Sequence, residues 1–129
     1  MVDRIKIAAG NWKMNGSFAT NDSLLSAIHA GSSGVTGEVM VFAPAVYLDR
    51  LVQAVQNMGS NIIVGAQNLS EHPHGAYTGE ISAAMIKELG CSHVLVGHSE
   101  RRSLFQESDQ VVAKKALAAL EHGLMPVSY

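Results

Sequence analysis

The sequence Val94-Leu95-Val96-Gly97-His98-Ser99-Glu100-Arg101-Arg102 passes directly from apolar residues to ionisable ones. Residues 94–96 are apolar and favour β-structure, which predicts a strand buried on both faces, as in a parallel sheet. The strand ends at Gly97, and polar or ionisable residues follow without a break. Ligands bind at the carboxyl ends of strands in parallel α/β folds. The stretch therefore predicts titratable groups at a binding edge.

Residues 97–102 allow two interpretations at this point. In the first, Ser99 caps the N-terminus of a helix, and His98 lies at the positive end of that helix, where its protonated form is disfavoured. That arrangement is typical of an active-site loop. In the second, the same residues form a salt-bridged corner between a strand and a helix.

The composition is that of one globular domain. The chain has 129 residues, a net charge of -2 and one cysteine, Cys91. This charge gives no reason to expect nucleic acid or an anionic membrane surface as a partner. Apolar runs fall far short of the ~20 residues of a membrane span. The first residues lack the apolar block of a signal peptide, and a lone cysteine suits a reducing compartment, so we expect a cytoplasmic protein.

Hydrophobic periodicity alternates between strand and helix along the chain. Apolar runs predict strands over 4–9, 38–42, 61–64 and 94–96, and residues 126–127 read as the start of a fifth. Helical spacing predicts helices within 17–30, 48–59, 81–89 and 111–123, with glycine at or just beyond their ends. Four such units, with a period of roughly 30 residues, predict a parallel sheet with right-handed crossovers.

Unusual polar loops follow three of the four predicted strands. These loops carry Asn11 with Lys13, Gln67 with Asn68, and His98 with Glu100. The carboxyl ends of parallel strands share one edge, so the three loops are expected to converge. A doubly wound sheet gathers its ligands at one crevice, whereas polar residues after successive strands fit the rim of a barrel better.

Four motifs resemble those of the triosephosphate isomerase family, in the same order and at similar spacing. They are Ala9-Gly10-Asn11-Trp12-Lys13-Met14-Asn15, Gly65-Ala66-Gln67-Asn68, Gly75-Ala76-Tyr77-Thr78-Gly79-Glu80 and Gly97-His98-Ser99-Glu100-Arg101-Arg102. Each motif alone is a weak signal, but four in register over residues 5–127 are highly specific.

The resemblance implies a (β/α)8 barrel enzyme that interconverts dihydroxyacetone phosphate and glyceraldehyde 3-phosphate through an enediolate, without a metal or organic cofactor. Carried over residue by residue, it places Asn11 and Lys13 in the substrate site. Lys13 would supply fixed positive charge for the phosphate and the developing oxyanion. His98 resembles the family's electrophile, a neutral imidazole, which is an established property of this family and not an inference from these residues.

The resemblance also implies roles for residues around that site. Glu100 is similar to the second carboxylate of the catalytic group and is expected to pair with Lys13. Ser99 is similar to the residue that holds the loop and the catalytic base in place. Thr78 lies on a loop that, in the family, inserts into a neighbouring subunit and steadies Asn11, so we expect a homodimer. The expected partner is a small phosphorylated triose.

The chain departs from the family pattern in its extent. A family barrel needs about 250 residues and eight strands, whereas residues 1–129 supply four β/α units and the start of strand five. They would form one partial barrel domain. The proton-abstracting carboxylate, the lid and the phosphate-binding glycines are expected beyond residue 129, which predicts little turnover by this chain alone. The alternative is an inactive half-barrel that self-associates, because strands one and four would each expose an unpaired edge.

Several other polar residues have structural interpretations. Arg101 and Glu107 are expected to form an ion pair that braces the loop. His72 and His74 lack a third ligand, so a solvated loop is favoured over a metal site. Cys91 precedes a buried strand and is expected to be a core thiol.

Overall fold

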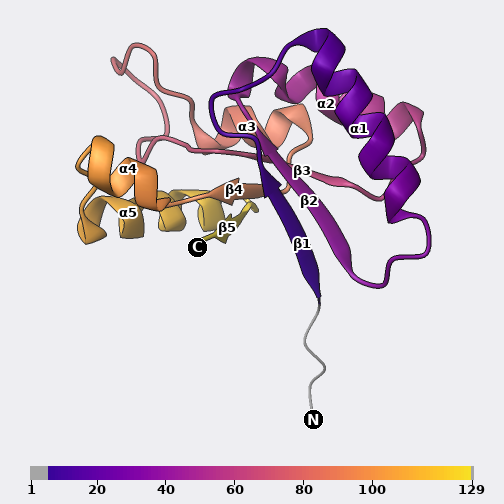
Figure 1. Cartoon of the computed structure of the whole chain (residues 1–129). Coiled ribbons are helices and arrows are strands. Elements are labelled where there is room, and N and C mark those ends of the chain that lie inside the picture. Colours follow the sequence, from indigo (N-terminus) through magenta and orange to yellow (C-terminus); the bar gives the residue numbers. More distant parts are fainter. Residues whose placement is uncertain (1–5, 129) are drawn as a thin grey trace.

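A computed structural model describes residues 6–128, which are organised around a parallel sheet. Its strands are β1 (Ile7–Asn11), β2 (Glu38–Ala43), β3 (Ile63–Ala66), β4 (His93–Leu95) and β5 (Met125–Val127). They pair in chain order, and each pair is parallel. The strand direction turns steadily across the sheet, so that β1 and β5 point in clearly different directions (Figure 1). The predicted parallel α/β half-barrel is confirmed.

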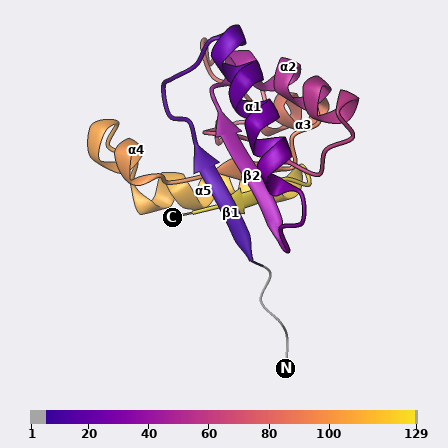
Figure 2. The same ribbon diagram turned by 45° about the vertical axis from the view of Figure 1, so that its right-hand side comes forward.

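Helices connect the strands. They are α1 (Phe18–Ser32), α2 (Ala45–Asn57), α3 (Ala83–Leu89), α4 (Ser99–Leu104) and α5 (Asp109–Glu121). Serine caps three of them: the hydroxyls of Ser17, Ser82 and Ser108 each accept a backbone N–H three residues along the chain. Such caps satisfy helix N–H groups that have no partner inside the helix. Figure 2 shows the same arrangement from a second angle, with β1 at the near edge of the sheet.

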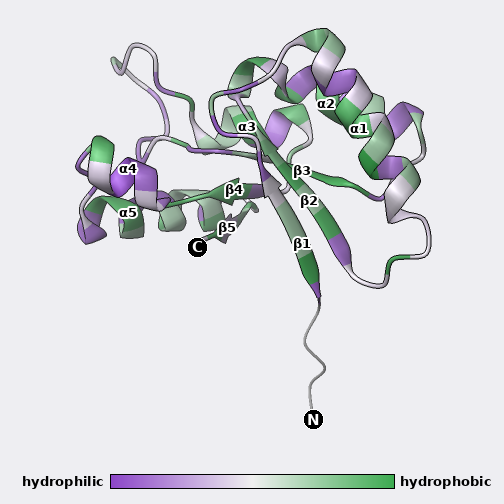
Figure 3. Cartoon of the chain, viewed as in Figure 1, coloured by the Kyte–Doolittle hydropathy of each residue, from purple (hydrophilic) through white to green (hydrophobic). Residues whose placement is uncertain are grey.

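Alternation of side chains along the strands divides the apolar residues between two clusters. Residues of β2, β3 and β4 on the convex face pack against the helices, forming a core that includes Val41, Val64 and Val94. Their neighbours on the concave face form a smaller cluster of Met40, Phe42 and Leu95, with Ile63 and Val127 at its border. The middle strands are mostly buried and largely apolar, as Figure 3 shows for most of β2 and β3, which is typical of a parallel sheet covered on both faces.

Glycine at position 65 lets the concave cluster close. A Cβ there would lie 2.5 Å from Cε1 of Phe42 and 2.8 Å from the carbonyl oxygen of His93. The phenyl ring therefore lies where a side chain of β3 would otherwise stand. The large side chain of Phe42 on β2 fills the space that the absence of a side chain at Gly65 leaves on β3, so the interior is closely packed.

Some predicted boundaries were wrong. The first strand continues to Asn11, and the part of its prediction at residues 4 and 5 lies outside the described residues. Helix α1 passes Gly31 and ends at Ser32. The short strand β5 pairs with β4, so the free edges of the described sheet are β1 and β5, not β1 and β4.

The expected cap of the helix after β4 was also wrong. Ser99 is the first residue of α4, and His98 is its N-cap, with the ring nitrogen in the position that a serine hydroxyl usually takes. Within residues 6–128, no helix is long and apolar enough to cross a membrane.

Candidate active site

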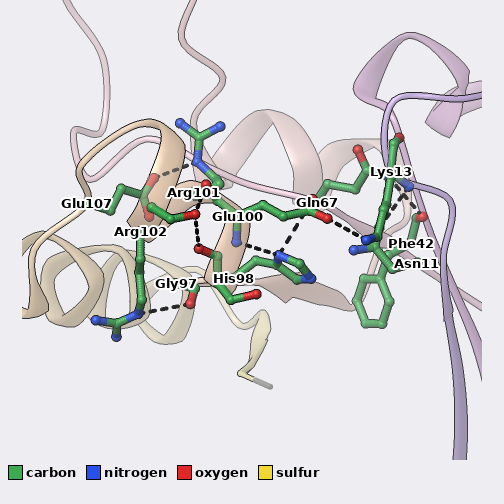
Figure 4. Close-up of polar contacts among 12 residues, drawn as sticks. Asn11, Lys13, Phe42, Gln67, Gly97, His98, Glu100, Arg101, Arg102 and Glu107 are labelled. Carbon is green, nitrogen blue, oxygen red and sulfur yellow. Dashed lines mark hydrogen bonds and ion pairs between the residues drawn. The ribbon is translucent and has the colours of Figure 1, made fainter.

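Three loops meet at the carboxyl ends of β1, β3 and β4, as the sequence predicts. They enclose a pocket of about 400 Å³. Its lining combines ionisable and amide side chains with apolar ones: Asn11, Lys13, Met14, Gln67, Asn68, Leu95, His98, Glu100, Arg101, Leu104 and Phe105. Figure 4 shows the polar members of this group, with His98 and Lys13 approaching from opposite sides.

Lys13 is held in an unusual backbone conformation. Its φ is +56°, in the left-handed region that residues other than glycine rarely occupy. Its N–H donates to Oδ1 of Asn11 at 2.9 Å, which ties the turn to the end of β1. The turn directs the Lys13 ammonium towards the loop after β4, where it donates to the Glu100 carboxylate and forms the predicted ion pair.

His98 combines a capping role with a position in the pocket wall. Its Nδ1 accepts the backbone N–H of Glu100 at 3.1 Å, and its side chain is 15 % exposed. A ring nitrogen that accepts a hydrogen bond carries no proton, so in the neutral ring the proton is on Nε2. The cap thus defines the tautomer, which makes Nε2–H a hydrogen-bond donor.

Glu100 is kept ionised by its surroundings. The hydrogen bond from Lys13 lowers the pKa of the Glu100 carboxyl, and desolvation opposes this less strongly. The charge of Lys13 adds to the lowering, and so does that of His98 when its ring is protonated. The pocket therefore holds a fixed cation and a fixed anion side by side at neutral pH.

Gln67 lies on one of the three polar loops that the sequence predicted to converge, but its contacts within the site were not predicted. Its Nε2 donates to Oδ1 of Asn11 at 3.2 Å, to the backbone oxygen of Lys13 at 2.8 Å and to that of Phe42 at 3.2 Å. Gln67 thereby joins the end of β1, the loop that follows it and strand β2 to the loop after β3. The sequence feature that could have indicated a role for Gln67 is its position in a polar loop directly after a buried strand.

A buried ionic network lies behind the pocket. Oε2 of Glu107 accepts from Arg101 and from Lys115, each at 2.6 Å, and Lys115 also donates to Asn68 at 2.8 Å. The predicted pair of Arg101 and Glu107 is confirmed, while Lys115, only 5 % exposed, was missed. Burial raises the pKa of the Glu107 carboxyl, but the hydrogen bonds from Lys115 and Arg101 outweigh this and lower it overall.

Ser99 and Thr78, to which the resemblance gave supporting roles, are not among the residues that line the described pocket. Ser99 is exposed at the start of α4, and its carbonyl accepts from the Ser103 hydroxyl. Thr78 is exposed on the long loop after β3, within a turn closed by the bond from Glu80 N–H to the Tyr77 carbonyl. Figure 1 shows this loop extending away from the sheet.

Other described parts of the chain bring together fewer ionisable side chains than this pocket. A larger hollow, of about 550 Å³, lies near the opposite ends of β2 and β3, and His29 is the one ionisable side chain of its described lining. Within residues 6–128, no three His, Cys, Asp or Glu side chains group as they would around a metal ion. The ring of His72 stacks on Tyr77, with centroids 3.9 Å apart. Cys91 is buried, as expected.

Comparison with known proteins gives a consistent result. The family model described as triosephosphate isomerase matches residues 6–128. Triosephosphate isomerase of Vibrio cholerae is 47% identical over 125 residues, which are 96% of this chain and 49% of that protein. The enzyme of Bordetella pertussis is 51% identical over 125 residues, covering 97% of this chain and 50% of its own length.

A solved structure agrees with the sequence comparison. The crystal structure of triosephosphate isomerase from Bartonella henselae superposes with a TM-score of 0.85 at 46% identity, covering 95% of this chain and 50% of that one. The chain spans about half the length of the curated relatives it matches. Because the family match extends over the whole described sheet and the pocket at its edge, the chain belongs to the triosephosphate isomerase family.

Proposed function

We propose that this chain carries the substrate-binding and electrophilic half of a triosephosphate isomerase site, for interconversion of dihydroxyacetone phosphate and glyceraldehyde 3-phosphate. The observation that supports this most directly is the shared pocket of Asn11, Lys13 and His98. A pocket with a fixed cation and a neutral ring donor suits a small anionic carbonyl compound. The proposal needs neither a metal nor an organic cofactor.

The geometry suggests how each residue would act on a bound triose phosphate. The reaction removes a proton from the carbon next to the carbonyl and leaves negative charge on the carbonyl oxygen. Nε2–H of His98 would donate to that oxygen, and Lys13 would stabilise the developing charge. The Asn11 side chain, whose Oδ1 is engaged by Lys13 and Gln67, would offer its Nδ2 donor to the substrate.

Proton abstraction requires a carboxylate that this pocket does not supply. Among the described lining residues, Glu100 is the one carboxylate, and it is paired with Lys13. We therefore propose that the 129-residue chain alone has little turnover, because a general base typically contributes 10²–10⁴-fold to such reactions. Ser99 would support the loop and the base in a complete site.

A binding experiment tests the site separately from turnover. Phosphoglycolate carries a phosphate and a carboxylate that mimics the enediolate charge, and it is expected to shift the NMR signals of His98 and Lys13. Lys13→Met should abolish the shift of His98, whereas Lys6→Met, at an exposed position outside the pocket, should not. An unshifted His98 at millimolar ligand would reject the binding site.

A coupled assay for triose-phosphate interconversion tests the second half of the proposal. Turnover by the 129-residue chain is expected to be at least about 10²-fold below that of a complete family enzyme. Activity close to the complete enzyme would show that the chain holds its own base.

Assembly with a second copy is the proposed partner interaction. Met14, Leu104 and Phe105 are exposed around the pocket, and Thr78 is exposed on the protruding loop. A homodimer in which this loop of one copy covers the pocket of the other would bury that apolar surface. The alternative, an inactive half-barrel that associates through its free strand edges, is favoured by the exposure of β1.

We further propose that residues 1–129 fold as one partial barrel domain and that the protein functions in the cytoplasm. The core that packs β2, β3 and β4 against the helices, together with the pairing of β1 and β5 onto that sheet, supports the first statement. The unpaired Cys91 thiol, buried in the core, suits a reducing compartment and supports the second.

A further inference from the structure

We propose that Gln67 is a positioning residue, whose side-chain amide holds the left-handed turn at Lys13 and thereby sets the direction of the Lys13 ammonium. This inference rests on the proposed function for its catalytic meaning, but its structural content can be tested separately. The amide donates to oxygens in three places: the Asn11 side chain, the Lys13 backbone and the Phe42 backbone.

The turn at Lys13 needs such support. A lysine at φ +56° lies in a region that its Cβ disfavours, so the isolated loop would relax towards other conformations. Three hydrogen bonds oppose this: from Lys13 N–H to Asn11, from Asn15 Nδ2 to the Trp12 carbonyl, and from Gln67 to the Lys13 carbonyl. They hold the peptide groups on both sides of the strained residue.

Gln67 is itself firmly placed. It follows Ala66, the last residue of β3, and it precedes Asn68, which accepts a hydrogen bond from the buried Lys115. Lys115 in turn is bound to Glu107, the partner of Arg101 in α4. The dipeptide 67–68 therefore connects the loop of Lys13 with the helix that begins beside His98, and Figure 4 shows Gln67 between them.

The chemistry of the side chain matters as well as its position. All three partners of Nε2 are hydrogen-bond acceptors, and an NH₂ group can serve them, whereas a carboxylate or thioether cannot. The bond from Gln67 to Asn11 also fixes the orientation of the Asn11 amide, because Oδ1 faces Gln67 and the Lys13 N–H. Gln67 touches none of the expected substrate atoms in this scheme and acts through Lys13 and Asn11.

The test uses the neutral variant Gln67→Met, which removes the donor without adding charge. The matched control is Gln56→Met, at an exposed position of α2. The readout is the pKa of Glu100, measured by carbon NMR of its carboxyl group, because Lys13 holds this pKa low. In Gln67→Met the pKa of Glu100 is expected to rise towards its ordinary value of 4.5, and it should stay low in the control.

Hydrogen exchange gives a second readout. The amide protons of Lys13 and Met14 are expected to exchange about tenfold faster in Gln67→Met, while those of the buried strand β2 keep their rates. If Gln67→Met does not fold cooperatively, Gln67→Asn is measured in its place. The asparagine keeps the amide group, but its side chain is one methylene shorter, so the amide no longer reaches the Lys13 carbonyl. The same changes are expected in Gln67→Asn.

An unchanged Glu100 pKa together with unchanged exchange at Lys13 would overturn the proposal. Phosphoglycolate titration separates this outcome from failure of the proposed function. If the unmodified chain does not bind phosphoglycolate, the proposed function fails, and the Glu100 titration still decides the role of Gln67. If the unmodified chain binds it, Gln67→Met is expected to bind about tenfold more weakly.

Discussion

Gly65 is the residue at which the close packing of the concave face is most easily tested. We expect Gly65→Ala to destabilise the chain by about 1–3 kcal/mol, because the added Cβ would overlap the Phe42 ring and approach the His93 carbonyl. Urea unfolding followed by circular dichroism measures the change. Gly31→Ala is the matched control: nothing lies within 4 Å of its Cβ position in α1, so it should stabilise by about 0.5–1 kcal/mol. Equal effects of both substitutions would contradict this packing.

Cys91 should be almost unreactive in the folded chain. It is buried at the start of the segment leading into β4, and burial raises the pKa of its thiol to about 11. Only the thiolate attacks alkylating reagents, so at pH 8 we expect iodoacetamide to react on the order of 100-fold more slowly than in urea-unfolded chain. Mass spectrometry over time measures both rates. Rapid alkylation of the folded chain would mean that this part of the core opens readily.

The contacts of the site differ in how far the sequence could predict them. The pairs Lys13–Glu100 and Arg101–Glu107 were predicted, the first from family motifs and the second from two charges close in sequence. The contact of Gln67 with Asn11 and that of Lys115 with Asn68 were not predicted, since these partners lie 56 and 47 residues away and nothing local marks an amide or a lysine as buried. Such contacts form only where loops from different strands lie side by side, and that arrangement exists only in the folded sheet.

Elements α4 and α5 are joined by the network around Glu107. Glu107→Gln would leave the buried Lys115 ammonium without its counter-charge, and we expect a loss of about 3–5 kcal/mol in unfolding free energy. Glu121→Gln, at an exposed position at the end of α5, is the control and should change stability by less than about 0.5 kcal/mol. Thermal unfolding of both variants at pH 7 makes the comparison. A small effect at Glu107 would show that water enters this network.

The same network has a defined pH dependence. Because the pKa of Glu107 is lower in the folded chain than its ordinary value near 4.5, the ionised carboxylate favours the folded state. This stabilisation is complete above that ordinary value and is lost as the pH falls through the lower folded-state pKa. The stability gap between the unmodified chain and Glu107→Gln should therefore shrink below about pH 4.5. A gap that stays constant down to pH 3 would contradict the assignment.

Element boundaries show a related limit of local patterns. The first helix was predicted from Ser17, which is its N-cap, whereas the helix predicted within 111–123 missed the cap at Ser108 and the first residues of α5. At α4 the nearest serine was the wrong residue, since a histidine ring nitrogen takes the capping position and places Ser99 inside the helix. Strand β5 consists of three residues and gains its pairing only from β4. Its existence depends on the neighbouring strand more than on its own sequence.

At the scale of the whole molecule, the sheet formed by residues 6–128 has two edge strands, β1 and β5, and within this range each of them pairs on one side only. Most of β1 is exposed, including Ile7 at 56 %, and Met125 of β5 is exposed to the same extent. Hydrogen bonds from Trp12 to Phe42 and from Glu38 to Lys6 show which residues of the first strand face β2. Because alternate residues face opposite edges, the N–H and C=O groups of Ile7, Ala9 and Asn11 point to the open side. Unpaired groups of this kind invite pairing with another chain.

We therefore expect this chain to self-associate in solution. In sedimentation velocity experiments its average mass should rise with concentration over the micromolar range, as strand edges and apolar surface become paired. Ala9→Pro removes the outward N–H at the centre of β1 while leaving the groups that face β2 intact, so it should weaken association. Ala9→Ser keeps the N–H and is the matched control, which should associate like the unmodified chain. If all three sediment as monomers that melt cooperatively, the curled sheet is stable with its edges open, and assembly through the loop around Thr78 would be excluded as well.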